Sequence, residues 1–417
     1  MKILLINKYY YIKGGSETYF FGLKQMLEKN GHEVAVFSMK DEKNFNTPYN
    51  KYFVENINYE NDKMIEKIKN AGKLIHSQEA SENLSKLIQD FQPDLAHVNL
   101  IYHQLTPSIF HTLKKNKIPI VFTSHDYKPV CPNYKLLTNN HLCDKCVTGN
   151  FTHCFLNKCH KASSSFSFLL MIEAFYHRYK KSYHLADYIV CPSKFMLSKL
   201  EQAGFNKDSL IHIPNFITND FSNYSIENDD LNLKNKRNSI LYYGRLSKEK
   251  GLDFLLDAKR EMDNKFTLEI VGTGPEEEHL KRRVHYENIK GVEFLGFKSG
   301  DELINLIKNC KATILPANWH EVFGLTIIES HSIGTPVIGS DLGGIGEIIK
   351  NGKNGFIYNN GDLKSLKKSI SQLFDLNEKQ YQEMASNSLN SSKKYKPEEY
   401  YKKIINVYSK LLQEKVG

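Results

Sequence analysis

The sequence predicts an α/β protein made of two doubly wound, Rossmann-like domains that face each other across a cleft. Three observations favour this class. Short apolar runs alternate with amphipathic stretches along almost the whole chain. Most of these runs are nearly continuous in apolar residues, which is typical of parallel strands covered on both faces. The 417 residues are too many for one ordinary core, so two domains are expected.

The first half of the chain contains six runs with the character of buried strands. They are KILLIN (2–7), EVAVFS (33–38), DLAHVN (94–99), IPIVFTS (118–124), DYIVCPS (187–193) and IHIP (211–214). An amphipathic stretch follows the first run and ends at Gly31, a residue type that often closes a helix. We assign residues 1–217 to an N-terminal, acceptor-side domain with a cysteine-rich insertion at 131–160.

A second series of strand runs begins after a polar stretch rich in Asn and Asp, which predicts a linker at 218–238. The runs are SILYYG (239–244), TLEIVG (267–272), VEFLG (292–296), ATILP (312–316) and PVIGS (336–340). They define a C-terminal domain at 239–397. Residues 398–417 carry a helical apolar stripe after Pro397, and this helix could return to the first domain.

The amino-acid composition limits the kinds of partner that this chain is expected to bind. A net charge of +9 favours anions such as nucleotides, phosphates or an acidic membrane surface. The basic residues are too dispersed to indicate nucleic acid. The first residues, MKILLINKYY, do not resemble a signal peptide, and no apolar run reaches the roughly 18 residues of a membrane span. We expect a cytoplasmic protein with reduced cysteines.

Several strand ends carry residues suited to ligands, which bind at the carboxyl ends of strands in open α/β sheets. His125 follows a strand in the first half, and its alternative role is a satisfied structural side chain. Arg245 and Lys250, in GRLSKEKG, follow the first strand of the second half. Two cations at this spacing suit a pair of phosphates, although a solvated basic turn has the same appearance.

Glycine-rich turns also follow strands, at Gly14-Gly15 and at Gly272 to Pro275. Backbone N–H groups in such turns can approach an anion, and a tight turn is the alternative. The chain has no GxGxxG, and its second strand ends in Ser38 rather than an acid, so a dinucleotide site is the weaker interpretation.

Two glutamates, Glu321 and Glu329, flank an expected helix start in HEVFGLTIIES (320–330). A carboxylate in the loop and another inside the helix can accept hydrogen bonds from hydroxyl groups at two ends of a sugar ligand. The helix start at Phe323-Gly324 leaves free N–H groups for an anion. Alternatively, both acids are ordinary surface or core-edge residues.

With these motifs in place, the chain resembles a family 4 glycosyltransferase with the GT-B fold. The resemblance covers nearly the whole chain in the family's order. It rests on NGHEVAVFS (30–38), SHDY (124–127), CPSKF (191–195), IPNFI (213–217), YYGRLSKEKG (242–251), IVGTGPEEE (270–278), LGF (295–297), HEVFGLTIIESHSIGTPVIGSDLGGIGEII (320–349) and NGF (354–356).

The resemblance implies a retaining sugar transfer from a nucleotide sugar held mainly by the second domain. It implies that Arg245 and Lys250 bind the diphosphate, that Glu321 binds the donor sugar, and that His125 touches the transferred sugar. Glu329 would bind the ribose. The other implied donor-binding residues are Gly15, Gly272, Gly274, Phe297, Phe323, Gly324 and Leu325. The family usually needs no metal for catalysis, in agreement with the lack of an Asp-x-Asp triplet.

Five cysteines fall within 29 residues of the insertion. Cys143-x2-Cys146 followed by Cys154-x4-Cys159 is close to the ligand spacing of a structural zinc site, with His141, His153 and His160 as nearby alternatives. The other interpretation is a set of reduced cysteines that pack the insertion.

The next stretch, 163–184, is apolar and basic. It predicts either a helix on an acidic membrane surface or a core helix with a basic outer side.

The predicted function is a retaining glycosyltransferase that uses a UDP-sugar in preference to a GDP-sugar. The acceptor would be a glycan or lipid-linked molecule of cell-surface polysaccharide biosynthesis, such as capsule or O-antigen, at the inner face of the membrane. A nucleotide-sugar epimerase on the same fold and a non-catalytic nucleotide-sugar binder are the alternatives. The insertion and the basic helix favour transfer, because an epimerase needs no acceptor site.

Overall fold

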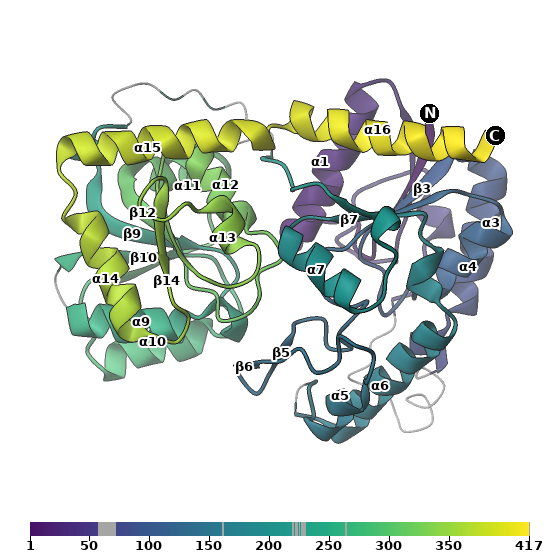
Figure 1. Ribbon diagram of the computed structural model, residues 1–417, viewed down its shortest axis with the longest axis horizontal. Helices are drawn as coiled ribbons and strands as arrows, with labels where there is room; N and C mark the ends of the chain where they lie inside the picture. The colour runs from purple at the N-terminus through teal and green to yellow at the C-terminus, as the bar shows by residue number, and fades with distance from the viewer. Residues whose placement is uncertain are drawn as a thin grey trace. The chain divides into compact units, whose positions relative to one another are not determined.

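The computed structural model describes residues 1–416 except 57–71, 161, 219–220, 222–223, 225, 227–230 and 263–264. The chain forms two compact units (Figure 1). Unit 1 comprises Met1–Pro214 with Tyr400–Gly417, and unit 2 comprises Asn215–Glu399. Nine positions of the predicted linker, 218–238, lie outside the described residues.

Unit 1 is built on a six-stranded sheet in which every neighbouring pair is parallel. In spatial order the strands are β2 (Glu33–Phe37), β1 (Lys2–Ile6), β3 (Leu95–Val98), β4 (Ile120–Thr123), β7 (Tyr188–Cys191) and β8 (Leu210–His212). Residues 3–6 of β1 are all fully buried. This burial confirms the prediction of strands covered on both faces, and each such side chain contributes about 1.5–3 kcal/mol.

Helices connect these strands, as parallel pairing requires. They include α1 (Gly15–Lys29), α3 (Gln78–Phe91), α4 (Ser108–Lys115) and α7 (Lys194–Gln202). The C-terminal α16 (Pro397–Val416) follows all the strands. Local sequence fixes their ends. The Ser77 hydroxyl accepts a hydrogen bond from the N–H of Ala80 at the start of α3, and Gly31, with φ of 80°, follows α1.

The C-terminal helix packs on unit 1 through a stripe of buried side chains. These are Tyr400, Ile404, Val407, Tyr408 and Leu411. The Tyr400 hydroxyl hydrogen-bonds Tyr19 of α1, and the Tyr408 hydroxyl hydrogen-bonds His97 of β3. The last helix therefore completes the core of the first unit.

The cysteine-rich insertion lies between β4 and β7. It contains a two-stranded antiparallel hairpin, β5 (Leu137–Thr138) with β6 (His141–Leu142), and two helices, α5 (Thr152–Leu156) and α6 (Ser164–Tyr179). The hairpin turns at Asn139 and Asn140, both with positive φ, as a tight two-residue turn requires. The hairpin's strands were not among the predicted ones, because each has only two residues.

Unit 2 repeats the plan with a second parallel sheet. Its spatial order is β11 (Val292–Gly296), β10 (Thr267–Val271), β9 (Arg237–Tyr243), β12 (Cys310–Leu315), β13 (Val337–Ser340) and β14 (Gly355–Tyr358). Five of these strands match predicted runs. The sixth, β14, was missed because its four residues lie between turns and lack a long apolar run.

The helices of unit 2 are α9 (Leu252–Met262), α10 (Glu277–Tyr286), α11 (Gly300–Asn309), α12 (Leu325–Ser332), α13 (Ile345–Ile348), α14 (Leu363–Phe374) and α15 (Glu378–Ser392). The strand order of each unit reverses beside its first strand, next to β1 in unit 1 and next to β9 in unit 2. Ligands of open α/β sheets bind at such switch points. None of the helices described in either unit combines the length and apolar character that a bilayer span requires.

Candidate functional site

The switch point of unit 2 brings two predicted site residues into direct contact. Lys250 ends the short helix after β9, and Glu321 lies in the loop after β12, the strand paired with β9. Lys250 Nζ lies 2.7 Å from Glu321 Oε2. The two side chains are only 22% and 13% exposed. The sequence predicted both residues, and the sheet order explains why they meet.

Trp319 completes this contact and was missed by the sequence analysis. Its indole N–H donates to Glu321 Oε2 at 3.2 Å, and its ring centroid lies 5.4 Å from the Lys250 ammonium. Both hydrogen bonds described for the Glu321 carboxylate reach Oε2, which leaves Oε1 for a ligand hydroxyl. The signal was present, because Trp319 is the only tryptophan of the chain and lies two residues before Glu321.

Arg245 lies in the same loop as Lys250 but differs in surroundings. Its side chain is exposed, while its carbonyl accepts a hydrogen bond from the buried Tyr242 hydroxyl at 2.8 Å. The backbone of the loop is thus fixed and the guanidinium remains accessible to an anion.

The start of α12 presents the N–H groups of a first helical turn. Gly324 caps the helix with φ of 98°, and a Cβ there would lie 2.8 Å from the Ile327 side chain. Leu325 is the first helical residue. Phe323, in contrast, is buried in the core, with its ring 5.7 Å from that of Tyr395. The side chain of Phe323 therefore belongs to the core of unit 2.

Glu329 lies one turn into α12 and is 8% exposed. It neighbours the buried Tyr243 hydroxyl, which also donates to the Thr326 carbonyl at 2.6 Å. Burial and the Glu329 carboxylate raise the pKa of Tyr243. The carboxylate is thus held by its own unit at the edge of the core.

Gly272 and Gly274 are required by the packing of two backbones. A Cβ at Gly272 would lie 1.9 Å from the Gly244 carbonyl oxygen, and one at Gly274 would lie 2.2 Å from that of Leu246. The turns after β9 and β10 therefore touch, which accounts for these glycines without a ligand. Phe297, after β11, is 71% exposed.

In unit 1, Gly15 is the exposed first residue of α1, after the loop that follows β1. Gly14 before it has an extended backbone. Lys8, which the sequence analysis did not single out, lies in the same loop. Burial, together with the nearby Lys13 ammonium, lowers the pKa of Lys8 to about 7.

His125 lies at the carboxyl end of β4. Its Nε2 is 2.9 Å from Asn99 Oδ1, and its ring centroid is 4.6 Å from that of Tyr19 on α1. The amide oxygen accepts, so the proton of the ring is on Nε2. Burial lowers the pKa of His125 to about 3, which keeps the ring neutral. Asn99 is the last residue of the predicted strand 94–99, and in the structure it directly follows β3, so its position at a strand end could have identified it.

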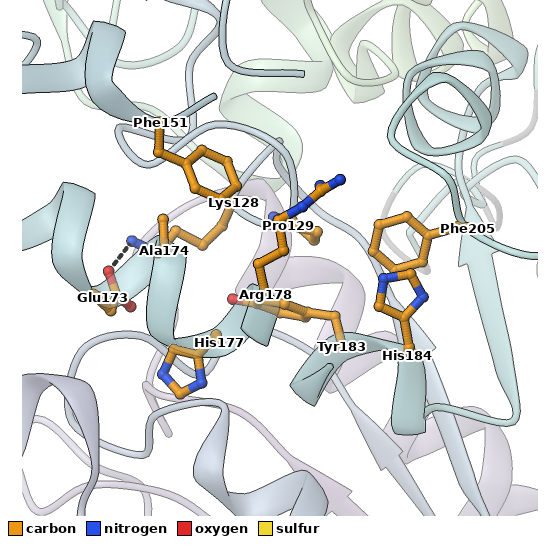
Figure 2. A pocket seen from close by; sticks show the side chains of 10 residues that line it. All are labelled: Lys128, Pro129, Phe151, Glu173, Ala174, His177, Arg178, Tyr183, His184 and Phe205. Atoms are coloured by element: carbon orange, nitrogen blue, oxygen red, sulfur yellow. Dashed lines mark hydrogen bonds and ion pairs between the residues drawn. The ribbon is translucent and has the colours of Figure 1, made fainter. Parts of the chain in front are cut away.

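A buried ion pair anchors the loop that carries His125. Lys128 Nζ lies 2.5 Å from Glu173 Oε2 of α6 (Figure 2). It also donates to the Pro132 carbonyl at 3.0 Å. The neighbouring Asp126 accepts the Lys128 backbone N–H at 2.9 Å, and burial raises the pKa of Asp126 to about 7. Loop and insertion therefore form one connected structure.

The predicted metal ligands also lie together. Cys143, Cys146, Cys154 and Cys159 line one small cavity, and Cys131 and His153 join them. Their sulfurs are not tightly clustered. Across the described part of the chain, the one group whose metal-binding atoms all lie within 4.8 Å of one another is Asp253, Glu276 and His279. There Asp253 already pairs with His279 and Arg283, so its charge is compensated.

Comparisons with known proteins cover both units. The model for Glycosyltransferase Family 4 matches residues 13–221, and the model for Glycosyl transferases group 1 matches residues 224–391. An uncharacterised glycosyltransferase of Methanocaldococcus jannaschii is 27% identical over 226 residues, 54% of this chain and 60% of that protein. This share is below two thirds of that relative's length.

A second relative, an uncharacterised 42.6 kDa protein in the cps region of Klebsiella pneumoniae, is 24% identical over 368 residues, 84% of this chain and 87% of that protein. Among solved structures, sucrose-phosphate synthase of Thermosynechococcus elongatus has a TM-score of 0.73 at 18% identity, over 99% of both chains. Anabaena HepE in complex with UDP and glucose has a TM-score of 0.65 at 18% identity, over 98% of this chain and 99% of that one. These likenesses confirm the predicted GT-B fold.

Proposed function

The chain belongs to glycosyltransferase family 4, and from this membership we propose a retaining transfer of a sugar from a nucleoside diphosphate sugar. The donor is a UDP-sugar in preference to a GDP-sugar. The acceptor is a glycan or lipid-linked molecule of cell-surface polysaccharide biosynthesis. The contact of Lys250 with Glu321 at the switch point of unit 2 is the observation that carries the proposal.

The chemistry of unit 2 suits such a donor. The Lys250 ammonium donates one hydrogen bond to Glu321, and its other protons remain for phosphate oxygens. The exposed Arg245 guanidinium adds a planar fork. In our proposal these two cations stabilise the charge that develops on the leaving diphosphate, so that the transfer proceeds without a metal ion.

Glu321 is proposed to orient the donor sugar. Lys250 and Trp319 hold one carboxylate oxygen, and the other can accept a hydrogen bond from a sugar hydroxyl. The carboxylate is fixed before the sugar arrives, so little side-chain entropy is lost on binding. Glu329 is proposed to accept hydrogen bonds from the ribose hydroxyls.

His125 is proposed to contact the transferred sugar from unit 1. Its neutral ring is held by Asn99 and Tyr19. A neutral imidazole with a fixed tautomer is suited to orient a hydroxyl group rather than to act as a general base. We propose that the transfer retains the configuration of the sugar because the chain belongs to this family.

Two comparisons support the finer parts of the proposal. HepE of Anabaena was solved with UDP and glucose, which favours a uridine donor. The Klebsiella pneumoniae relative is described by its place in the cps region, which favours a surface polysaccharide product.

An exposed apolar face on the insertion favours a membrane-bound acceptor. It comprises Phe155 and Leu156 of α5 with Phe168, Ile172, Phe175 and Tyr179 of α6. The α6 residues recur every three or four positions and so share one side of the helix. These six make up more than half of the eleven large hydrophobic side chains that are exposed among the described residues. The helices α5 and α6 pack together in unit 1 (Figure 1).

The charge around this face suits an anionic lipid surface. Lys158, Arg178, Lys180 and Lys181 are exposed at its edge. Between residues 145 and 184 the sequence contains a single acid, Glu173, and it is buried against Lys128. Apolar side chains beside uncompensated cations are typical of proteins that lie on acidic membranes.

The donor assignment is tested by thermal shift with UDP, GDP and ADP, followed by the sugar forms of the nucleotide that binds. We expect the largest rise in Tm with UDP, because a ligand that binds only the folded state stabilises it by mass action. Release of UDP on addition of a lipid-linked glycan would complete the test. A protein that binds none of the nucleotides, or that converts the UDP-sugar to an isomer without acceptor, would contradict the proposal.

The membrane surface is tested by sedimentation with vesicles of phosphatidylcholine alone or with phosphatidylglycerol added. We expect binding only to the anionic vesicles, and its loss in Ile172→Glu and Tyr179→Glu. Tyr286→Glu is the matched control, because Tyr286 is 80% exposed on α10 of unit 2. Equal binding by all variants, or salt-independent association of the protein with itself through this face, would refute the membrane assignment.

A further inference from the structure

Five of the seven cysteines of the chain meet in unit 1. All five thiols are free, and all line one small cavity in the insertion. Cys131 comes from the turn after β4, Cys143 and Cys146 follow β6, and Cys154 and Cys159 belong to α5 and the turn after it. Thiols form weak hydrogen bonds, so packing alone gives no reason to gather five of them from three segments.

Cys131 and Cys143 are joined through the backbone of Leu136. The Leu136 N–H donates to the Cys131 sulfur, and the Leu136 carbonyl accepts the Cys143 N–H at 2.9 Å. The N–H groups of Asn133 and Lys135 also point at the Cys131 sulfur. Several N–H donors thus converge on this one sulfur, whose own S–H donates to Asn133 Oδ1 at 3.0 Å.

Cys154 is the most buried of the five cysteines, at 1% exposure. Its thiol donates to the Ser167 carbonyl at 3.7 Å, and its side chain packs with Phe151 and Leu170 in an apolar core. Deep burial and this bond fit a thiol that keeps its proton.

We propose that this cavity binds one Zn²⁺ ion through Cys131, Cys143, Cys146 and Cys159, with Cys154 kept as a neutral thiol bonded to the Ser167 carbonyl. Four thiolates form a common ligand set for structural zinc, and the pair Cys143-x2-Cys146 has its usual chelating spacing. Bonds of about 2.3 Å in a tetrahedron would draw the sulfurs to about 3.8 Å from one another. Binding releases the thiol protons.

Such an ion would fix the loop that carries His125. Cys131 lies six positions after His125, and its N–H donates to the Tyr127 carbonyl at 2.7 Å. The Asn133 amide also donates to the Cys159 carbonyl at 3.3 Å. Zinc would therefore tie this loop to the β5–β6 hairpin and to the turn before α6.

The test is elemental analysis of the full chain purified without a polyhistidine tag. We expect about one zinc per chain in the wild type and in Cys154→Ser, and a loss of most of it in Cys131→Ser. Replacement of zinc by Co²⁺ gives a second readout, since a tetrahedral thiolate site has intense visible bands. It is applied to the folded wild type, so it remains informative if Cys131→Ser does not fold.

Three results would overturn the proposal. One is a wild-type protein without metal that also fails to take up Zn²⁺ or Co²⁺ under reducing conditions. Another is iron with acid-labile sulfide, which would indicate an iron–sulfur cluster. The third is a loss of zinc in Cys154→Ser as large as in Cys131→Ser, which would contradict the ligand assignment.

Discussion

Lys250 and Glu321 lie 71 positions apart in the chain, and their Nζ and Oε2 atoms lie 2.7 Å apart at the ends of two paired strands. Trp319 donates to the same carboxylate oxygen. The contact therefore unites a cation suited to phosphate with a carboxylate suited to sugar hydroxyls. It is a partly buried ion pair whose members also have a proposed catalytic role.

Lys250→Ala should lower kcat/KM for the donor by at least about 100-fold, since loss of one charged donor to a developing anion costs this much in other enzymes. The Tm should change little. Arg260→Ala is the matched control, because Arg260 pairs with Glu287 at 2.6 Å on the surface of the same unit. Equal activity of the two purified variants would remove Lys250 from the site.

Gly272→Ala should destabilise the protein by more than about 2 kcal/mol, because its Cβ would lie 1.9 Å from the Gly244 carbonyl oxygen. Gly296→Ala is the control. Gly296 also has positive φ, at 67°, but no atom lies within 4 Å of its Cβ position, so only the backbone penalty of about 1–2 kcal/mol remains. Urea titration measures the free energy of unfolding of both variants. Similar losses of stability in the two variants would refute the explanation by close backbone approach.

Asn99→Asp should make activity pH-dependent. Burial holds the pKa of His125 at about 3 in the wild type, so the ring stays neutral across the assay range. A carboxylate 2.9 Å from Nε2 favours the charged ring and moves its pKa upward. Above pH 5, we expect the pH profile of the wild-type rate to show no ionisation of His125. We expect the profile of the variant to show one additional ionisation. Identical pH profiles would show that Asn99 does not position His125.

Acid should destabilise the fold through buried histidines. Burial lowers the pKa of His97, His125, His177 and His331 to about 3 each, from about 6.5 in the unfolded chain. Between these values the unfolded state binds more protons, so the free energy of unfolding falls as the pH falls. The slope reaches about 1.4 kcal/mol per pH unit for each histidine. A Tm that is constant from pH 7 to pH 4 would contradict this.

Tyr408→Ala should destabilise unit 1 by about 3–5 kcal/mol, because it removes a fully buried ring of α16. Tyr408→Phe should cost only about 1 kcal/mol, for the hydrogen bond to His97. Thermal unfolding compares them. If the alanine variant were as stable as the wild type, α16 would not be part of the unit 1 core.

The sequence by itself determined the fold class, because continuous apolar runs report burial on both faces without any knowledge of partners. It placed eleven of the strands within about two residues of their ends. It selected Lys250 and His125 by their position after strands, and Glu321 by its position before an expected helix start. It missed β14 and the hairpin, since strands of four and two residues carry too little periodicity.

Only the tertiary structure decided which of these residues meet. The contact of Lys250 with Glu321 depends on β9 pairing with β12, and sequence spacing does not specify strand order. The structure also gave Gly272 a packing role, placed the Phe323 ring in the core, and set Cys131 beside Cys143. The physical reason is common to all four. Local patterns encode the burial and conformation of each segment, whereas the environment of a side chain comes from segments distant in sequence that the sheet brings together.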